Sequence, residues 1–267
     1  MLERNFHSGL SVPPEEVRIG PLNILRLQEA EALDMVRAAV LSQKPLDIAI
    51  CNAHTILTAL DTPDYAATLG AMTLLNDGVG VNLASQVLNG KSFPDNLNGT
   101  DFVPLLLENA GLPLRIYLFG AGEAQVQATK GCIEVLYPDH LIVGARNGYF
   151  DPAKIEEICA EIQAAEPDLL LVGMGNPRQE QFIVENRHRL SAVTVAIGVG
   201  ALFDFMSGSV VRAPRPVRAL GMEWLFRLLQ EPRRLSKRYF VGIPRFLYQI
   251  AKLKWADRRR GSVNSDR

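Results

Sequence analysis

The segment from residue 167 to residue 182 holds the densest group of side chains that could bind a phosphorylated ligand. Its apolar run, Leu169 to Val172, is typical of a strand buried on both faces of a parallel sheet. Gly173 and Gly175 follow, where the backbone can turn sharply and approach a ligand closely. The Asn-Pro-Arg-Gln-Glu run at residues 176–180 is suited to cap and open a helix, whose free N–H groups attract phosphate. The segment therefore predicts an anion site, or else an ordinary strand–turn–helix corner with solvated polar residues.

The same pattern of an apolar run followed by glycines recurs at residues 75–80, 115–122 and 194–200. None of these is a complete G-x-G-x-x-G, so the pattern gives little support for a nicotinamide or flavin, and we expect no cofactor. Several such corners in series predict an α/β fold, a Rossmann-like parallel sheet flanked by helices. The carboxyl ends of its strands would line one crevice, which is the expected ligand site.

Composition limits the class of protein. The chain has 267 residues, of which 48% are hydrophobic and 21% charged, which excludes global disorder. No signal peptide and no apolar run of about 20 residues are recognised, so we expect a cytoplasmic location. The three cysteines are isolated and the four histidines form no H-x-x-x-H pair, which disfavours disulfides and a zinc site.

Charge is distributed unevenly along the chain. Residues 212–267 contain 15 Lys or Arg against 4 Asp or Glu, whereas residues 1–211 contain 13 against 25. The change falls at a proline-rich joint, residues 212–216. We therefore expect an α/β catalytic domain over residues 1–211 and a C-terminal basic helical appendage over residues 212–267. A basic tail on an acidic body favours an anionic partner such as a membrane surface or a nucleic acid.

Hydrophobic periodicity places the other elements. It predicts a helix over residues 28–43 and a strand over 47–51, and then, beyond Pro216, helices over 217–231 and 233–256. Gly242 and Pro244 should break the last of these helices. Residues 1–20 are expected to form a loose arm.

Eight short motifs, taken in order, resemble the WecG/TagA/CpsF family of bacterial glycosyltransferases over nearly the whole chain. They are Asn52-Ala53, the Asp-Gly-Val-Gly-Val run at 77–81, Asn-Gly-Thr-Asp at 98–101, Leu-Phe-Gly-Ala-Gly-Glu at 118–123, Asn-Gly-Tyr-Phe at 147–150, Gly-Met-Gly-Asn-Pro-Arg-Gln-Glu at 173–180, Gly-Val-Gly at 198–200, and the closing Glu-Trp-Leu-Phe-Arg at 223–227 with Glu-Pro-Arg-Arg at 231–234. The resemblance implies transfer of a sugar, with inversion, from a UDP-sugar donor to a polyprenyl-diphosphate-linked acceptor.

An inverting transfer needs a carboxylate to take the proton of the acceptor hydroxyl, and positive groups to hold the departing diphosphate. Asp77, in a glycine turn after an apolar run, is placed to be that base and matches the family's proposed base. The alternative is a turn aspartate that caps the following helix. The substrate-binding residues that we expect are Asn52, His54, Thr55, Asn98, Asp101, Gly120, Gly122, Gly173, Gly175, Gln179, Glu180, Arg227, Arg233 and Arg234.

Metal ligands are not evident in the sequence. Many nucleotide-sugar transferases hold a divalent cation with an Asp-x-Asp pair, but no such pair occurs here, and Asp61 and Asp64 have the wrong spacing. Arginines and helix N-termini could instead hold the leaving diphosphate. We therefore expect a metal-independent enzyme.

One position departs from the family pattern. Many members carry an arginine before the Asn-Gly-Thr-Asp motif, where this chain has Asn96. An amide cannot replace the bidentate contact of a guanidinium. The loop is more similar to the GumM-like exopolysaccharide branch, so glucose is the first choice of donor sugar, with N-acetylmannosamine or N-acetylmannosaminuronate transfer as the alternative.

The resemblance also implies a place of action, peripheral on the inner face of the cell membrane, with an anionic membrane surface as partner. Aromatic residues mixed with the basic ones in the tail favour that surface, and no nucleic acid is expected. A homo-oligomer is left open. Outside catalysis, a nucleotide-binding regulatory module would explain the glycine corners, but not Asp77, Gln179 and the basic tail together.

Overall fold

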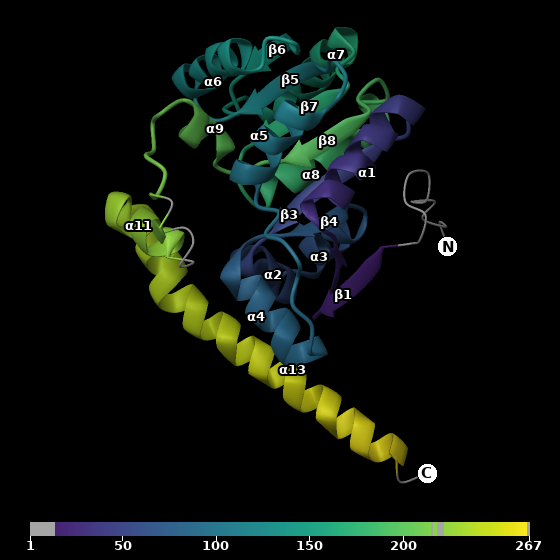
Figure 1. The fold of residues 1–267 in the computed structure, drawn as a ribbon, viewed down its shortest axis with the longest axis vertical. Coiled ribbons are helices and arrows are strands. Elements are labelled where there is room, and N and C mark those ends of the chain that lie inside the picture. The colour runs from purple at the N-terminus through teal and green to yellow at the C-terminus, as the bar shows by residue number, and fades with distance from the viewer. Residues whose placement is uncertain (1–13, 215, 218–221, 266–267) are drawn as a thin grey trace.

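The computed structural model describes residues 14–214, 216–217 and 222–265, with side chains as far as residue 259 except those at 234, 237 and 238. Its centre is a six-stranded, wholly parallel sheet in the order β4-β3-β8-β7-β5-β6 (Figure 1). The strands are β3 (Leu46–Cys51), β4 (Thr73–Asn76), β5 (Arg115–Gly120), β6 (Leu141–Arg146), β7 (Leu169–Gly173) and β8 (Val195–Gly198). This confirms the predicted α/β fold with a parallel sheet flanked by helices.

Helices cover both faces of the sheet because alternate strand side chains point to opposite sides. In β7, Leu170 and Val172 belong to one apolar cluster, and Leu169 and Leu171 to the other. The first cluster is covered by α2 (Ala53–Asp61), α3 (Pro63–Gly70), α4 (Gly78–Asn89), α7 (Ile155–Ala165) and α8 (Arg178–Asn186). The second is covered by α1 (Glu29–Ser42), α5 (Gly99–Asn109), α6 (Glu123–Leu136) and α9 (Leu202–Met206).

The crevice arises where neighbouring strands send the chain to opposite faces. β3 and β8 are adjacent, yet the chain leaves β3 into α2 on one face and leaves β8 into α9 on the other. β7 and β5 are likewise adjacent and lead to α8 and α6 on opposite faces. Diverging connections open a space at the carboxyl edge of the sheet, as expected for open α/β folds.

The N-terminal segment differs from the expected loose arm. Residues 15–26 form an antiparallel hairpin of β1 (Glu15–Ile19) and β2 (Leu22–Arg26). Val17, Ile19, Leu22 and Ile24 are buried in the first cluster, so alternate residues of both strands pack on the body. The prediction was wrong for residues 15–20, and residues 1–13 lie outside the described part.

The C-terminal segment forms α11 (Glu223–Gln230), α12 (Pro232–Ser236), the π-helical η3 (Lys237–Val241) and α13 (Gly242–Ser265). The helix predicted over residues 233–256 is divided where Gly242 and Pro244 were expected to break it. The π-helical η3 ends at Val241 and α13 begins at Gly242, with Pro244 in its first turn, where proline is tolerated. α13 packs on α2 and α4 and then extends past the body (Figure 1). Phe246 and Ile250 are buried in the first cluster, which anchors this helix to the body.

Candidate active site

A cavity of about 1540 Å³ lies at the carboxyl edge of the sheet. Residues after β3, β4, β5, β7 and β8 line it, as do residues of α11, η3 and α13. Its volume exceeds the range of about 300–1,000 Å³ that suits one small ligand. The cavity is therefore large enough for two substrates, and the C-terminal appendage forms one of its walls.

Asp77 lies in this lining, between β4 and α4. It occupies the N-cap position of α4 but makes no side-chain cap hydrogen bond; the N–H of Gly78 is donated to Asn96 Oδ1 at 2.7 Å. The Asn52 amide donates to Asp77 Oδ2 at 3.5 Å, and the Asp77 N–H donates to the Cys51 carbonyl at 2.8 Å. Asp77 therefore lines the cavity, and its side chain does not serve as the cap of α4.

Asn52 is oriented by the start of α2. Its side-chain oxygen accepts the N–H of His54 at 3.0 Å, the N–H of Thr55 at 3.2 Å and the Thr55 hydroxyl at 3.3 Å. With the oxygen held there, the amide nitrogen must point toward Asp77. Thr55 is fully buried and acts through Asn52, whereas His54 lies in the cavity lining.

The glycines after β5 and β7 are packed against each other. Gly120 has φ +143°, and a Cβ added there would lie 2.4 Å from the Gly173 carbonyl oxygen, so only glycine fits. The Ala121 N–H donates to that same oxygen at 2.8 Å. This contact brings Gly122, at the start of α6, beside Gly173 and Gly175 in the cavity lining.

Gln179 lies in the lining, and Glu180 lies behind it. The Gln179 oxygen accepts the N–H groups of Gly175 and Gly200, and its nitrogen donates to Glu180. Glu180 is fully buried, and burial raises the pKa of its carboxyl above the ordinary value. The expected helix cap at Asn176 was wrong: Pro177 holds the N-cap position, and the Asn176 amide donates to Glu180 at 2.7 Å.

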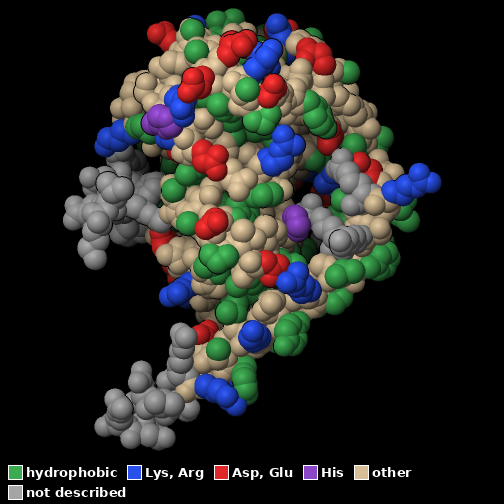
Figure 2. Space-filling model, turned by 180° about the vertical axis from the view of Figure 1, so that it is seen from behind, with side chains coloured by type: hydrophobic (Ala, Val, Ile, Leu, Met, Phe, Trp, Pro, Cys, Tyr) green, Lys and Arg blue, Asp and Glu red, His purple; other side chains and the backbone are tan. Residues whose placement is uncertain are grey.

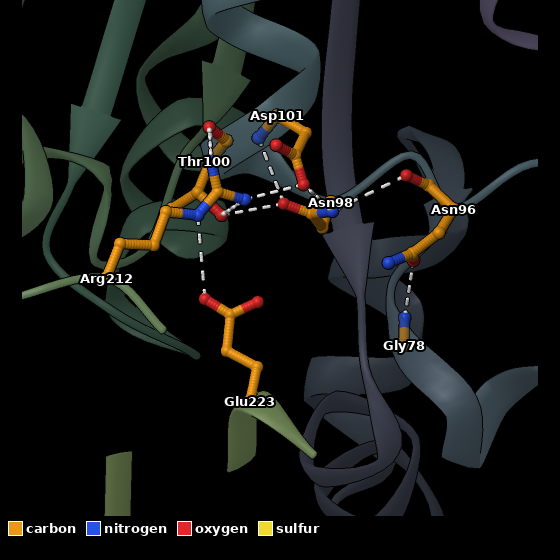
Figure 3. A network of polar contacts seen from close by, with 7 residues as sticks. All are labelled: Gly78, Asn96, Asn98, Thr100, Asp101, Arg212 and Glu223. Carbon is orange, nitrogen blue, oxygen red and sulfur yellow. Dashed lines mark hydrogen bonds and ion pairs between the residues drawn. The ribbon is translucent and has the colours of Figure 1, made fainter. Parts of the chain in front are cut away.

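A polar network joins the loop before α5 to the appendage (Figure 3). Asn98 caps α5 by accepting the Asp101 N–H at 3.0 Å, and its amide donates to the Asp101 carboxylate at 2.8 Å. Arg212 pairs with that carboxylate, donates to the Thr100 carbonyl at 3.2 Å, and lies 3.6 Å from the Glu223 carboxylate. Asp101 therefore holds Arg212, and through it α11, and does not itself line the cavity.

Arg227 is the cation that α11 contributes to the cavity lining. Its side chain is 17% exposed, its Cζ lies 5.0 Å from the Phe205 ring centroid, and its Nη2 lies 3.6 Å from the Glu231 carboxylate. Its Nε is buried without a hydrogen-bond partner in the described part of the chain. Because Arg227 lines the cavity, its guanidinium is a donor suited to an anion bound there.

Nine of the predicted site residues lie in the lining: Asn52, His54, Asp77, Asn98, Gly122, Gly173, Gly175, Gln179 and Arg227. Thr55, Asp101, Gly120 and Glu180 lie directly behind it for the reasons given above. Arg233 lies outside the lining with an exposed side chain, and the side chain of Arg234 lies outside the described residues.

Sequence reasoning missed several residues of the site. Tyr65 donates its hydroxyl to Glu180 at 3.1 Å from α3, a contact across 115 positions of sequence that no local pattern shows. Trp224, Tyr239 and Phe246 form the appendage wall. Arg212 lies in the proline-rich joint that the sequence showed, but the local sequence did not indicate its partners Asp101, Thr100 and Glu223. Among the described residues, no group of three or more His, Cys, Asp or Glu is placed to hold a metal ion.

Comparison with known proteins agrees with this geometry. The profile of the glycosyl transferase WecG/TagA/CpsF family matches residues 17–260. An N-acetylglucosaminyldiphosphoundecaprenol N-acetyl-beta-D-mannosaminyltransferase of Bacillus spizizenii is 32% identical over 238 residues, 87% of this chain and 90% of the relative. A protein of Bacillus subtilis (strain 168) with the same name is 32% identical over 207 residues, 77% of this chain and 78% of the relative. The chain therefore belongs to the WecG/TagA/CpsF family and is a glycosyltransferase.

Proposed function

We propose that this enzyme transfers an N-acetylmannosaminyl residue, with inversion, from a UDP-sugar to a polyprenyl-diphosphate-linked N-acetylglucosamine. The observation that carries the proposal is Asp77, which lines a cavity of about 1540 Å³ and whose side chain does not cap its helix. The names of the two relatives support both the donor sugar and the acceptor.

The choice of donor sugar reverses the first expectation from the sequence. Glucose was preferred because Asn96 stands where many members of the family carry an arginine. In the structure the Asn96 oxygen accepts the N–H of Gly78, beside Asp77. Arginine has no acceptor and could not make this bond. Asn96 thus has a local structural role, so its presence is not by itself an argument for glucose. The names of the relatives support the N-acetylmannosamine alternative.

In the proposed mechanism Asp77 takes the proton of the acceptor hydroxyl as that oxygen attacks the anomeric carbon. Asn52, fixed by Thr55 and the start of α2, keeps the carboxylate turned toward the cavity. Arg227 and the glycine loops around Gly122 and Gly173 hold the diphosphate of the leaving UDP. His54 and Asn98 contact the sugars, and Arg233 and Arg234 stay candidates for the acceptor's diphosphate.

The appendage, which we take as residues 212–267, is proposed to dock on an anionic membrane surface. One side of α13 is buried on the body, while Leu247, Tyr248 and Trp255 on it are exposed, as are Phe240 and Val241 before it. Figure 2 shows hydrophobic and basic side chains together along this helix. None of the described helices is long and apolar enough to cross a bilayer. Peripheral contact through this helix is consistent with a lipid-linked acceptor.

The proposal is tested by incubating the full chain with UDP-N-acetylmannosamine or UDP-glucose and a synthetic prenyl-diphosphate N-acetylglucosamine. Mass spectrometry of the lipid product should show addition of N-acetylhexosamine from the first donor, and NMR should show inversion at the transferred sugar. Transfer from UDP-glucose alone would contradict the donor assignment. No transfer from either would contradict the function.

A further inference from the structure

A buried hydrogen-bond network at the wall of the cavity joins two of its loops. Gln179, in the first turn of α8, is 1% exposed. Its side-chain oxygen accepts the N–H of Gly175 at 3.0 Å and that of Gly200 at 3.1 Å. These glycines belong to the loops after β7 and β8, and both lie in the cavity lining. One amide oxygen therefore ties together two loops that come from neighbouring strands.

Glu180 fixes which way this amide points. Its Oε1 accepts from the amides of Gln179 and Asn176, both at 2.7 Å, and its Oε2 accepts from the Tyr65 hydroxyl at 3.1 Å. A carboxylate can only accept hydrogen bonds, so the Gln179 amide must turn its nitrogen toward Glu180 and its oxygen toward the loops. Glu180 thus orients the Gln179 amide, although it takes no part in the chemistry of Asp77.

The backbone around the network leaves room for it. Gly175 and Gly200 have φ +75° and +56°, conformations that favour glycine. A Cβ added at Gly198 would lie 2.8 Å from the Gln179 nitrogen, so the end of β8 is bare where this side chain passes. A side chain at Gly198 would therefore collide with that of Gln179, so Gln179 requires glycine at this position.

We propose that Gln179 is a positioning residue that holds the 173–175 and 198–200 loops in the shape that binds the donor's nucleoside diphosphate, with Glu180 setting its orientation. The inference rests on the proposed function. Loops at the carboxyl ends of parallel strands that are rich in glycine, as these two are, let a diphosphate approach the backbone closely. Gln179 acts through these loops, because its oxygen and nitrogen are both engaged within the protein.

Gln179→Met keeps the length of the side chain and removes its hydrogen bonds. We expect the Kd for UDP, measured by calorimetry, and the KM for the donor to rise about tenfold. At saturating donor, kcat should stay within about threefold, since Asp77 is untouched. Gln181→Met, the same change two residues along α8 and outside the cavity lining, is the control. An unchanged UDP affinity in folded Gln179→Met protein would overturn the inference.

Gln179→Glu tests the role of Glu180, because it places a second carboxyl against the first. At low pH the two can share one proton and restore the hydrogen bond between them, whereas at high pH both are ionised and repel. We expect the loss of UDP affinity, relative to the native chain at the same pH, to shrink as the pH falls. Tyr65 and Cys51, which also interact electrostatically with Glu180, are present in both proteins and cancel.

In Gln179→Met the loss of UDP affinity relative to the native chain should not change with pH. A loss that is independent of pH in Gln179→Glu would overturn the orienting role of Glu180.

The positioning role of Gln179 and the proposed function can fail separately. A native chain that binds UDP but transfers no sugar contradicts only the proposed function. A native chain that transfers sugar, with a UDP affinity that Gln179→Met leaves unchanged, contradicts only the positioning role. A native chain that does not bind UDP contradicts both.

Discussion

Among single residues, Asp77 differs from an ordinary helix-capping aspartate because it lines the cavity and its side chain makes no cap hydrogen bond. Asp77→Asn keeps the shape of the side chain and removes its basicity. Since a positioned general base contributes on the order of 10²–10⁴-fold, we expect kcat to fall by that order while thermal unfolding is unchanged. The matched control is Asp151→Asn, because Asp151 truly caps a short helix, η1 (Pro152–Lys154), by accepting the Ala153 N–H. Near-native turnover of Asp77→Asn would remove Asp77 from the role of base.

The cation that Arg227 brings to the site supports metal-independent departure of the diphosphate. We expect turnover measured after treatment with EDTA and desalting to equal that of the untreated enzyme. Arg227→Gln should lower kcat/KM for the donor by about tenfold to a hundredfold, because hydrogen bonds to a charged group contribute about 1.5–3 kcal/mol. Loss of activity in EDTA that Mg²⁺ or Mn²⁺ restores would show that a metal ion is required.

Glu180 should make stability depend on pH in the opposite sense from most carboxylates. Burial raises its pKa in the folded protein above the ordinary 4.5, so the folded state keeps this proton to a higher pH than the unfolded chain. Its contribution to stability is therefore fully present below the unfolded pKa and is lost as the pH rises through the folded pKa.

Urea unfolding of Glu180→Gln and of the native chain, compared at several pH values, measures this contribution. The free energy of unfolding of the native chain, relative to the variant, should decline as the pH rises from about 4. Glu157→Gln, which neutralises an exposed carboxylate on α7, is the control. A difference that grows with pH would contradict the raised pKa.

Among the elements, those that follow local periodicity could be predicted from the sequence. β3, β7 and β8 are short apolar runs, and the helix predicted over residues 28–43 agrees closely with α1. The hairpin over residues 15–26 was not predicted, because each of its strands has only five residues and so shows too short an alternation of apolar and polar positions. Gly242 and Pro244 mark the point where the stretch over residues 233–256 divides, because both residues are tolerated at the start of a helix.

The candidate site was predictable to the same extent. Residues that follow directly after a strand, such as Asn52, Asp77 and Gly122, lie in the cavity lining because parallel strands end at one edge. Contacts between distant elements were not predictable. Arg212 contacts Thr100 across 112 positions of sequence, and neither local sequence indicates this contact.

Arg212 is expected to hold α11 against the body. Arg212→Ala removes the pair with Asp101 and the contact with Glu223 and leaves two carboxylates close together. Chymotryptic cleavage at Trp224 or Tyr239 in the appendage should then become about tenfold faster, because α11 opens more often, and transfer should slow. Arg189→Ala, which breaks the exposed pair with Glu156 beside α7, serves as control. Cleavage at the native rate would show that the appendage is held by other contacts.

Considering the whole molecule, several exposed apolar side chains lie on α4, η3 and α13. Val79, Leu83 and Val87 recur along α4, and Phe240, Tyr248 and Trp255 follow on the appendage. α13 packs directly against α4, whose Val79 and Leu83 also line the cavity, so the appendage surface lies beside the active site. Lys252, Arg258 and Arg259 lie among them, and the Arg259 guanidinium stacks over the Trp255 ring at 3.5 Å. An apolar surface rimmed by cations suits a bilayer with anionic headgroups, to which each basic residue contributes about 1 kcal/mol.

Point substitutions test this surface better than truncation, because removing α13 would also uncover the side chains that pack on its buried Phe246 and Ile250. The triple variant Phe240→Ser, Tyr248→Ser, Trp255→Ser removes exposed side chains and should leave the melting temperature unchanged. Each lost aromatic anchor reduces the apolar area available to the membrane. We therefore expect flotation with liposomes containing anionic lipid to fall at least about tenfold, and transfer to a long-chain acceptor in those liposomes to fall with it. Transfer to a short, water-soluble acceptor should be retained.

The control is Val135→Ser, Leu136→Ser, which removes similarly exposed apolar side chains from α6 on the opposite part of the body (Figure 1). Native-like flotation of the triple variant, or an equal loss in the α6 control, would contradict docking through this helix.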